Sequence, residues 1–256
     1  MIHPTAVIDP SAKIADSVEV GAYSIIGADV EIGEKTWIGP HVVIQGPCKI
    51  GSENKLFQFS SIGEVPQDKK FHGEVSHLEI GDRNTIREFA TINRGTEDGG
   101  GTTRIGNDNW LMAYIHIAHD CQVGDNTIFA NNASLAGHAV VQDFAILGGF
   151  TLVHQFCKIG QHAFCGMGSA ISKDVPPYTM ANGSPAHTHG LNSEGIKRKG
   201  FTKETMKALR DAYKIIYRSN NTTEVAKNEL KPLAEKFPEV KNMLEFIEQS
   251  ERGILR

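Results

Sequence analysis

The sequence has 256 residues, of which 40% are apolar and 22% charged, and its net charge is −4. It contains no apolar run of about eighteen residues and no secretory signal at its start, so we expect a cytoplasmic protein without a membrane span. The acidic balance does not favour nucleic acid as a partner, and four cysteines without a CxxC pair suit a reducing compartment.

From the second residue onward, an aliphatic side chain returns at every sixth position. Such a period fits neither an amphipathic helix nor an ordinary strand, whose side chains repeat about every 3.6 and 2 residues. It is typical of a β-solenoid, in which three short strands make one coil and bond to the coils above and below, about 4.8 Å away. The first eleven positions of the repeat are Ile2, Ile8, Ile14, Val20, Ile26, Ile32, Ile38, Ile44, Ile50, Leu56 and Ile62.

Two stretches interrupt this repeat. After Ile62 the next sixth positions are Asp68 and Glu74, which the interior of a coil does not accept, so we expect an excursion loop near 64–78. A Gly-rich stretch near 94–103 breaks the repeat again and shifts its frame by one residue. Loops that leave a rigid scaffold commonly carry function, although each of these could also be a tolerated insertion.

The repeat then continues without a miss until two adjacent prolines, which cannot donate to a strand ladder, follow it at 176–177. We therefore expect a β-solenoid domain over 1–190 and a small α-helical domain over 191–256. The repeat positions of this second half are Ile105, Leu111, Ile117, Val123, Phe129, Leu135, Val141, Leu147, Val153, Ile159, Cys165 and Ile171.

The C-terminal part has helical periodicity, and we expect helices over 202–219, over 223–236 and from Pro238 onward. From Leu191 to the end it carries fourteen Lys and Arg against ten Asp and Glu, so the rest of the chain is acidic. The first helix presents a basic stripe, which is either a docking surface for an acidic partner or an ordinary solvated face. The stripe consists of Lys203, Lys207, Arg210, Lys214 and Arg218.

The strongest polar signals lie on the repeat. Because three hexads make one coil, His119 should neighbour Gly137 on the next coil, and Asp120 should neighbour His138. Four histidines and an aspartate are thus expected along one edge of the solenoid, although any one of them alone could be a solvated corner residue. The whole set is His116, His119, Asp120, Gly137, His138, His154 and Gln155.

This set suggests acid–base chemistry. A neutral imidazole can take a proton from a hydroxyl, and a neighbouring carboxylate fixes its tautomer, as Asp120 could do for His119. Gly137 lacks a Cβ and leaves its N–H open to a ligand, which makes it a candidate oxyanion donor. No Ser or Cys is placed by a motif as nucleophile, so we expect direct attack by a substrate hydroxyl.

A zinc site is the competing interpretation, since histidines on neighbouring coils could hold the ion and leave a position for water. However, His116 and His119 are three residues apart on an extended segment, where their rings should point to opposite sides. We therefore predict no metal and no cofactor.

Several longer motifs carry a resemblance to a known family: GEVPQDKKF, IRE, NRGT, HIAHDC, ANNASLAGH, LGGFTLVHQFC, DVPPY, GLNSEGIKRKGF and AYKIIYRS. Over almost its whole length the chain resembles the bacterial UDP-N-acetylglucosamine O-acyltransferases. The resemblance implies a left-handed parallel β-helix, a homotrimer with active sites between subunits, and the first step of lipid A biosynthesis. In that step a (R)-3-hydroxyacyl chain passes from acyl carrier protein to the 3-hydroxyl of UDP-N-acetylglucosamine.

The resemblance also implies residue roles. His119 matches the general base of the family, Asp120 its orienting partner, and the Gly137 amide its oxyanion donor. The residues that match positions binding substrate or acyl chain are His116, His138, His154 and Gln155. Those that match sugar- or nucleotide-binding positions are Asp68, Lys70, Asn192, Glu194 and Arg198.

Two positions depart from the family. Lys199 stands where Arg is common, and a lysine offers phosphate a point charge in place of a bidentate fork. Met167 stands where some members have Gly at the floor of the acyl groove, so we expect a preference for shorter acyl chains. The alternative for Met167 is a flexible core filler that points elsewhere.

Other functions remain open at this level. The nearest are transfer to another nucleotide sugar and N-acylation of an amino sugar. More distant ones are a zinc-dependent lyase of the hexapeptide carbonic anhydrase kind and a non-enzymatic scaffold. The sequence does not give the acyl chain length, the handedness of the coil, or which subunit supplies which loop.

Overall fold

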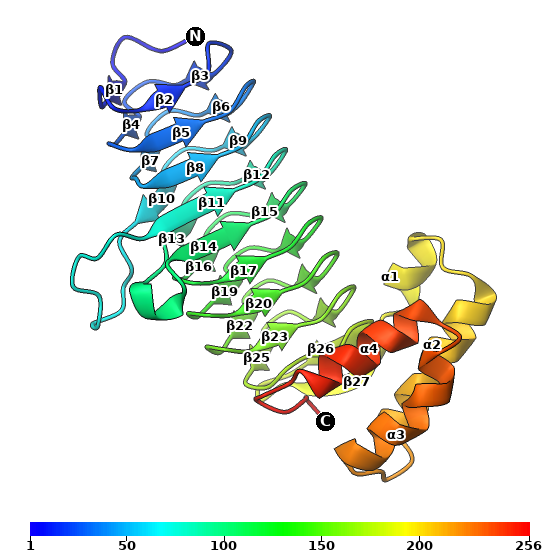
Figure 1. Cartoon of the computed structure of the whole chain (residues 1–256). Coiled ribbons are helices and arrows are strands. Elements are labelled where there is room, and N and C mark those ends of the chain that lie inside the picture. Colours follow the sequence, from blue (N-terminus) through cyan, green and yellow to red (C-terminus); the bar gives the residue numbers. More distant parts are fainter.

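A computed structural model describes all residues from 1 to 256. The chain forms a left-handed parallel β-helix of triangular cross-section, and a small helical domain follows it at the C-terminal end (Figure 1). The three faces of the prism are parallel sheets of nine, eight and ten strands, here called sheets 1, 2 and 3. The chain visits them in this order in every coil.

Most strands are only two or three residues long, because each face of the prism is narrow. Sheet 1 contains β1 (Val7–Ile8), β4 (Ile25–Ile26), β7 (Val43–Ile44), β10 (Ser61–Glu64), β13 (Thr91–Asn93), β16 (His116–Ile117), β19 (Ser134–Leu135), β22 (Leu152–Val153) and β25 (Ala170–Ile171). Sheet 2 contains β2 (Lys13–Ile14), β5 (Val30–Ile32), β8 (Cys48–Ile50), β11 (His77–Ile80), β14 (Thr102–Ile105), β17 (Gln122–Val123), β20 (Val140–Val141) and β23 (Lys158–Ile159). Sheet 3 contains β3 (Glu19–Val20), β6 (Trp37–Ile38), β9 (Lys55–Leu56), β12 (Thr85–Ile86), β15 (Trp110–Leu111), β18 (Ile128–Phe129), β21 (Ile146–Leu147), β24 (Phe164–Cys165), β26 (Thr179–Asn182) and β27 (His187–Leu191). The last two are antiparallel to each other.

The six-residue repeat is confirmed as the interior of the coils. From Val20 onward the repeat positions up to Ile171 are at most 4% exposed and form one continuous core. Each pairs in register with its equivalent on the next coil, as Ile117 does with Leu135, and Leu135 with Val153. The eighteen-residue coil therefore brings together the residues that the sequence placed on one edge.

The corners between the sheets turn through residues in the left-handed region. Asp120 and His138, with φ of 62° each, occupy equivalent corner positions on successive coils. A non-glycine residue pays on the order of 1 kcal/mol for this backbone, and the strand ladders on both sides hold it there. We call the three edges corner 1/2, corner 2/3 and corner 3/1, after the sheets that they join.

Both interruptions of the repeat are loops that leave corner 1/2. The first lies between β10 and β11, over 65–76, and the second lies between β13 and β14, over 94–101. A short 3-10 helix, η1 (Glu97–Gly99), forms part of the second loop. Figure 1 shows the two excursions on the same side of the prism.

The helical domain has a core of its own and four helices, α1 (Ser193–Arg198), α2 (Lys203–Tyr217), α3 (Thr223–Ala234) and α4 (Pro238–Glu248). Three of them lie where the periodicity predicted them, and Thr202 caps α2 by accepting from Thr205 N–H. The periodicity did not predict α1, because this helix has only six residues, of which only Ile196 is buried. None of the helices is long and apolar enough to cross a bilayer.

Candidate active site

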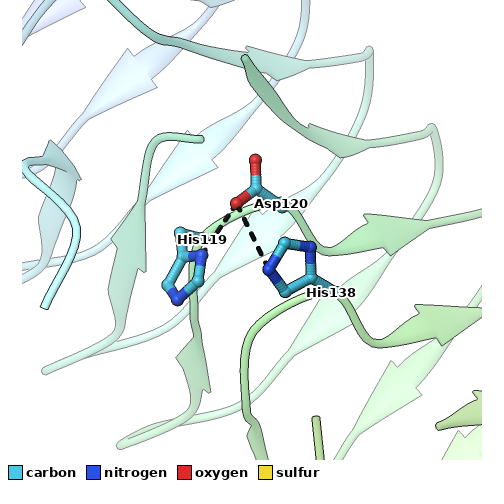
Figure 2. Close-up of side chains that lie close together, drawn as sticks. All are labelled: His119, Asp120 and His138. Atoms are coloured by element: carbon cyan, nitrogen blue, oxygen red, sulfur yellow. Dashed lines mark hydrogen bonds and ion pairs between the residues drawn. The ribbon is translucent and has the colours of Figure 1, made fainter. Parts of the chain in front are cut away.

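The polar residues meet at corner 1/2, in the middle of the prism. His119 and Asp120 follow β16, and His138 follows β19, which pairs with β16 through His116 and Ser134. Figure 2 shows the two imidazole rings on either side of the Asp120 carboxylate. The ring centroids of His119 and His138 are 5.1 Å apart and their planes are nearly perpendicular.

Asp120 is a buried carboxylate whose oxygens are all engaged. Oδ2 accepts from His119 Nδ1 at 2.7 Å and from the Thr96 hydroxyl at 2.7 Å, and Oδ1 accepts from Thr96 N–H at 2.9 Å. Burial works against the charged form, but the His119 bond and the two Thr96 bonds outweigh it and lower the pKa of Asp120 below its ordinary value. Asp120 is therefore ionised at neutral pH, so it accepts a hydrogen bond from His119 Nδ1–H, and the proton stays on the imidazole.

The other nitrogen of His119 faces the first loop. The Asp68 carboxylate lies 4.0 Å from Nε2, too far for a hydrogen bond and close enough for both groups to contact one small molecule between them. Asp68 also accepts the N–H of Lys70, whose own side chain is exposed. With the Nδ1 proton on the Asp120 side, neutral His119 offers its Nε2 lone pair to the space beside Asp68.

Gly137 lies directly against the His119 ring. A Cβ at this position would come within 2.6 Å of Cε1 and 2.7 Å of Nε2, so no side chain fits. The N–H of Gly137 donates to no group of the chain. The strand ladder does not need this N–H, since Pro10, which has none, occupies the equivalent position of the same corner on the first coil. The Gly137 N–H thus remains available beside the imidazole.

His138 and His116 flank this pair as neutral rings. His138 stacks on Phe156 of the next coil with 4.4 Å between centroids, and burial lowers the pKa of His138 although the Asp120 charge opposes this. His116 pairs with the Thr91 hydroxyl at 2.8 Å, and burial together with the nearby His119 lowers the pKa of His116. Both rings can bind a substrate through hydrogen bonds without bringing a positive charge.

His154 and Gln155 lie at the same corner, one coil beyond Gly137 and His138, and both are exposed. The His154 ring contacts the carbonyl of Gln155 at 3.2 Å. These two residues therefore continue the row of polar side chains that runs along corner 1/2 from His119.

The remaining predicted residues lie at other corners. Met167 lies between β24 and β25 at corner 3/1 and is 80% exposed, so within one subunit it is not a core filler. Asn192, Glu194, Arg198 and Lys199 belong to α1 and its caps, beside corner 2/3. Within one chain the structure does not bring these residues to His119.

Two of these four residues, Asn192 and Lys199, contact the rest of the chain. The Asn192 side chain donates to the carbonyl of His162 and accepts from Gly195 N–H, so it fixes the start of α1. The Lys199 ammonium lies over the Phe144 ring, 4.4 Å from its centroid. Glu194 and Arg198 are exposed and free to reach a ligand.

Sequence reasoning missed Thr96. Its two bonds to Asp120 come from the second loop, where no periodicity indicates which residue lies where. The only signal was the NRGT motif, which the resemblance quoted without a role.

The cluster also fits a metal poorly. Ligand atoms of His119, Asp120 and His138 lie within 4.8 Å of one another. However, Asp120 Oδ2 already accepts two hydrogen bonds, and His119 Nδ1 is turned to it as a donor. A shared ion would have to replace these bonds.

Comparison with known proteins places these features in a family. The model described as "Udp N-acetylglucosamine O-acyltransferase; Domain 2" matches residues 174–255, and that of the six-repeat bacterial transferase hexapeptide matches 102–137. An acyl-[acyl-carrier-protein]–UDP-N-acetylglucosamine O-acyltransferase of Thiobacillus denitrificans is 59% identical over 255 residues, which cover 100% of this chain and 99% of the relative. The enzyme of the same name from Herminiimonas arsenicoxydans is 55% identical over 262 residues, with coverage of 100% and 99%.

Solved structures of similarly named enzymes also resemble this chain over its whole length. The UDP-N-acetylglucosamine acyltransferase of Francisella novicida superposes with a TM-score of 0.98 at 43% identity, covering 100% of this chain and 94% of that one. The UDP-N-acetylglucosamine O-acyltransferase of Moraxella catarrhalis gives a TM-score of 0.98 at 50% identity, covering 100% and 99%.

Proposed function

Because this chain belongs to the family of acyl-[acyl-carrier-protein]–UDP-N-acetylglucosamine O-acyltransferases, we propose that His119 is the general base of its reaction. The enzyme moves an acyl chain from acyl carrier protein to UDP-N-acetylglucosamine in lipid A biosynthesis. The transferred group is a (R)-3-hydroxyacyl chain and the acceptor is the 3-hydroxyl of the sugar. The observation that carries the role of His119 is the bond from its Nδ1 to a buried, ionised Asp120.

The chemistry follows from the two nitrogens of one ring. Nε2 takes the proton of the sugar hydroxyl while the hydroxyl oxygen attacks the carbonyl carbon of the acyl thioester. The imidazolium that forms is stabilised by the Asp120 carboxylate. When the C–S bond breaks, the same nitrogen returns its proton to the leaving thiolate of the carrier, so the enzyme ends in its starting state.

The Gly137 N–H supplies the electrostatic stabilisation of the negative charge that develops in the reaction. It is unpaired and adjacent to the ring, so it can donate to the oxyanion of the tetrahedral intermediate. No covalent acyl-enzyme is needed. The nearest thiol, Cys121, is fully buried, and burial raises its pKa to about 12, which leaves it protonated and unreactive.

The surface of the prism supports assembly as a trimer. Sheet 2 carries charges outward on Lys13, Glu31, Lys49, Glu79 and Arg104. The outward positions of sheets 1 and 3 carry fewer charges and several large apolar side chains, among them Ile25 and Leu152 on sheet 1 and Trp37, Trp110 and Phe164 on sheet 3. Between them, corner 3/1 exposes a continuous stack of rings from Tyr23, His41, Phe59, Phe89 and Tyr114, with centroids 4.7 to 5.3 Å apart. Such a ridge is typical of a subunit contact.

This surface also explains why one chain carries an incomplete site. With sheet 1 of one subunit against sheet 3 of the next, a heterologous contact closes into a ring whose axis lies at corner 3/1. Corner 1/2 of one subunit then meets corner 2/3 of its neighbour at the rim. His119 and Asp68 of one subunit thereby face Arg198 and Lys199 of the neighbour, which carry the positive charge that a nucleoside diphosphate needs.

The acyl chain would occupy the contact between adjacent subunits that the sugar nucleotide leaves free. From His119 it would run along the contact between sheets 1 and 3, beside His154 and Gln155, toward corner 3/1. Met167 is the exposed apolar side chain at that end, so it would limit the length of the chain.

The basic stripe of α2 would receive the carrier protein. Lys203, Lys207, Arg210, Lys214 and Arg218 are all exposed. The surface is predominantly basic, although Asp211 pairs with Lys214 at 3.2 Å, and it would attract an acidic carrier to the domain that bears the nucleotide residues. We place the enzyme in the cytoplasm, in keeping with its four buried, unpaired cysteines.

The test is a direct assay. Purified protein is given UDP-N-acetylglucosamine or its 3-amino analogue, and a panel of 3-hydroxyacyl carriers. We expect an O-acylated product from the 3-hydroxyl sugar, and its loss in His119→Ala. Equal rates for wild type and His119→Ala would refute the role of His119, and preference for the amino sugar would replace O-acylation by N-acylation.

A further inference from the structure

The segment Asn93–Thr96 opens the second loop, and the mechanism above does not use it. Thr96 lies 6% exposed and gives Asp120 two hydrogen bonds, from its N–H at 2.9 Å and from its hydroxyl at 2.7 Å. Asp120 Oδ2 is therefore shared between Thr96 and His119 Nδ1, with each bond at 2.7 Å. The second loop is in direct contact with the carboxylate that orients the base.

The direction of the Thr96 hydroxyl is also fixed. Gly99 N–H donates to Thr96 Oγ1 at 3.2 Å, which leaves the hydroxyl proton for Asp120. The glycines of the loop make room for this contact, since a Cβ on Gly99 would overlap the Asp120 carboxyl and one on Gly95 would come within 2.8 Å of Oδ1. Gly100 and Gly101, with φ of 89° and 78°, then return the chain to β14. The Gly-rich loop is therefore built around one carboxylate.

The other end of the segment holds the first loop. Asn93 Nδ2 donates to the carbonyl of Val65 at 2.8 Å, and Arg94 N–H donates to that of Glu64 at 3.2 Å. The Arg94 guanidinium also bonds the carbonyls of Gly46 and Gly63. The stem of the loop that brings Asp68 to His119 Nε2 thus rests on the same four residues.

We propose that Thr96 is a positioning residue for the acyl transfer, which it supports through Asp120. A carboxylate held by His119 alone could rotate about its terminal torsion, whose energy wells are broad. Three donors in fixed directions remove that freedom. The His119 ring is then held with Nε2 toward the acceptor hydroxyl. This inference rests on the proposed role of His119 and goes beyond it, because it assigns catalytic importance to a loop outside the repeat.

The first test compares two substitutions of Thr96. Thr96→Val keeps the shape and removes the hydroxyl, whereas Thr96→Ser keeps the donor. We expect Thr96→Val to lower kcat about ten- to a hundredfold, the usual cost of a hydrogen bond to a charged group, with KM for UDP-N-acetylglucosamine within about twofold. Thr96→Ser should recover most of the rate. The matched control is Thr127→Val, which removes another buried hydroxyl bond, to Asn109 Oδ1 at 2.6 Å, away from the site.

The control separates positioning from stability. Both valine variants should lower the melting temperature, but only Thr96→Val should lower kcat. If kcat stays at the wild-type value in Thr96→Val, or falls equally in Thr127→Val, the positioning role is wrong.

The second test is a double-mutant cycle with Asp120→Asn. If Thr96 acts through Asp120, adding Thr96→Val to Asp120→Asn should lower kcat by less than about twofold. Full additivity would overturn the inference, since Thr96 would then act independently of Asp120. The single variant Asp120→Asn distinguishes a failure of the proposed function from a failure of the inference about Thr96. If it keeps wild-type kcat, the proposed function itself fails, whereas a low rate for Asp120→Asn with a normal rate for Thr96→Val contradicts only this inference.

Discussion

The His119 ring lies against the Cα of Gly137, so closely that a Cβ would come within 2.7 Å of Nε2. Gly137→Ala should therefore displace the ring and lower kcat about a hundredfold, because a base that loses its alignment loses most of its contribution. Steady-state kinetics measure the effect. Gly149→Ala is the matched control, since it occupies the equivalent position of a different corner and its Cβ would meet only Asn131 O at 3.3 Å. Similar rates in the two variants would mean that the contact has no catalytic weight.

Met167 is 80% exposed at corner 3/1, and we propose that it closes the end of the acyl groove. Removing its side chain in Met167→Gly should lengthen the groove by several methylenes. Relative kcat/KM for donors longer by two to four carbons should rise by about fifteen- to two-hundredfold, at about 0.8 kcal/mol for each methylene that becomes buried. Competition between two carriers of different chain length measures this ratio directly. An unchanged ratio would show that Met167 lies outside the groove.

The basic stripe of α2 should matter for the carrier and not for the sugar. Reversing Lys207 and Arg210 to Glu should raise KM for the carrier-bound donor about tenfold and weaken its dependence on salt, with KM for UDP-N-acetylglucosamine unchanged. Reversal of Lys231 and Lys241, which are exposed on α3 and α4, is the control for net charge. An unaltered KM for the carrier would leave the stripe as an ordinary solvated helix face.

His162 should make the stability of the protein depend on pH. It is stacked between Phe144 and Tyr178, and burial, helped by the charge of Lys199, lowers the pKa of His162 from 6.5 to about 4. Between these two values the unfolded chain binds a proton that the folded chain does not, so this residue lowers stability as the pH falls from about 6.5 to 4. His162→Phe keeps the stack and removes the titration. Its melting temperature relative to wild type should increase from pH 7 to pH 5, and a constant difference would exclude the effect.

The interior of the fold could be predicted from the sequence because a coil of fixed length imposes a fixed period. The same arithmetic correctly placed His119 beside Gly137 and Asp120 beside His138, since strand pairing fixes which residues are neighbours. The period is the same for either hand of the coil, however. The usual preference for right-handed crossovers points the wrong way here.

The conformation of the loops and the assembly of subunits depend on tertiary contacts and not on a periodic pattern in the sequence. Thr96 reaches Asp120 from a segment without periodicity, and its position depends on tertiary hydrogen bonds that no local pattern encodes. The short α1 was missed for a related reason, because its start is fixed by Asn192, whose side chain bonds to the distant His162 carbonyl. Met167 and Arg198 lie at corners away from His119, and assigning them to these corners required the three sheets of the structure.

The central claim is that His119 of one subunit works with Arg198 of its neighbour. Co-expression of His119→Ala with Arg198→Glu, followed by isolation of mixed trimers through two different tags, tests it most directly. Each variant alone should be nearly inactive, and about one site in three should be intact in every mixed trimer, because an intact site needs one unmutated corner from each of two adjacent subunits. Recovery of about a third of the wild-type kcat is the predicted result. Mixed trimers as inactive as their two parents would contradict the account.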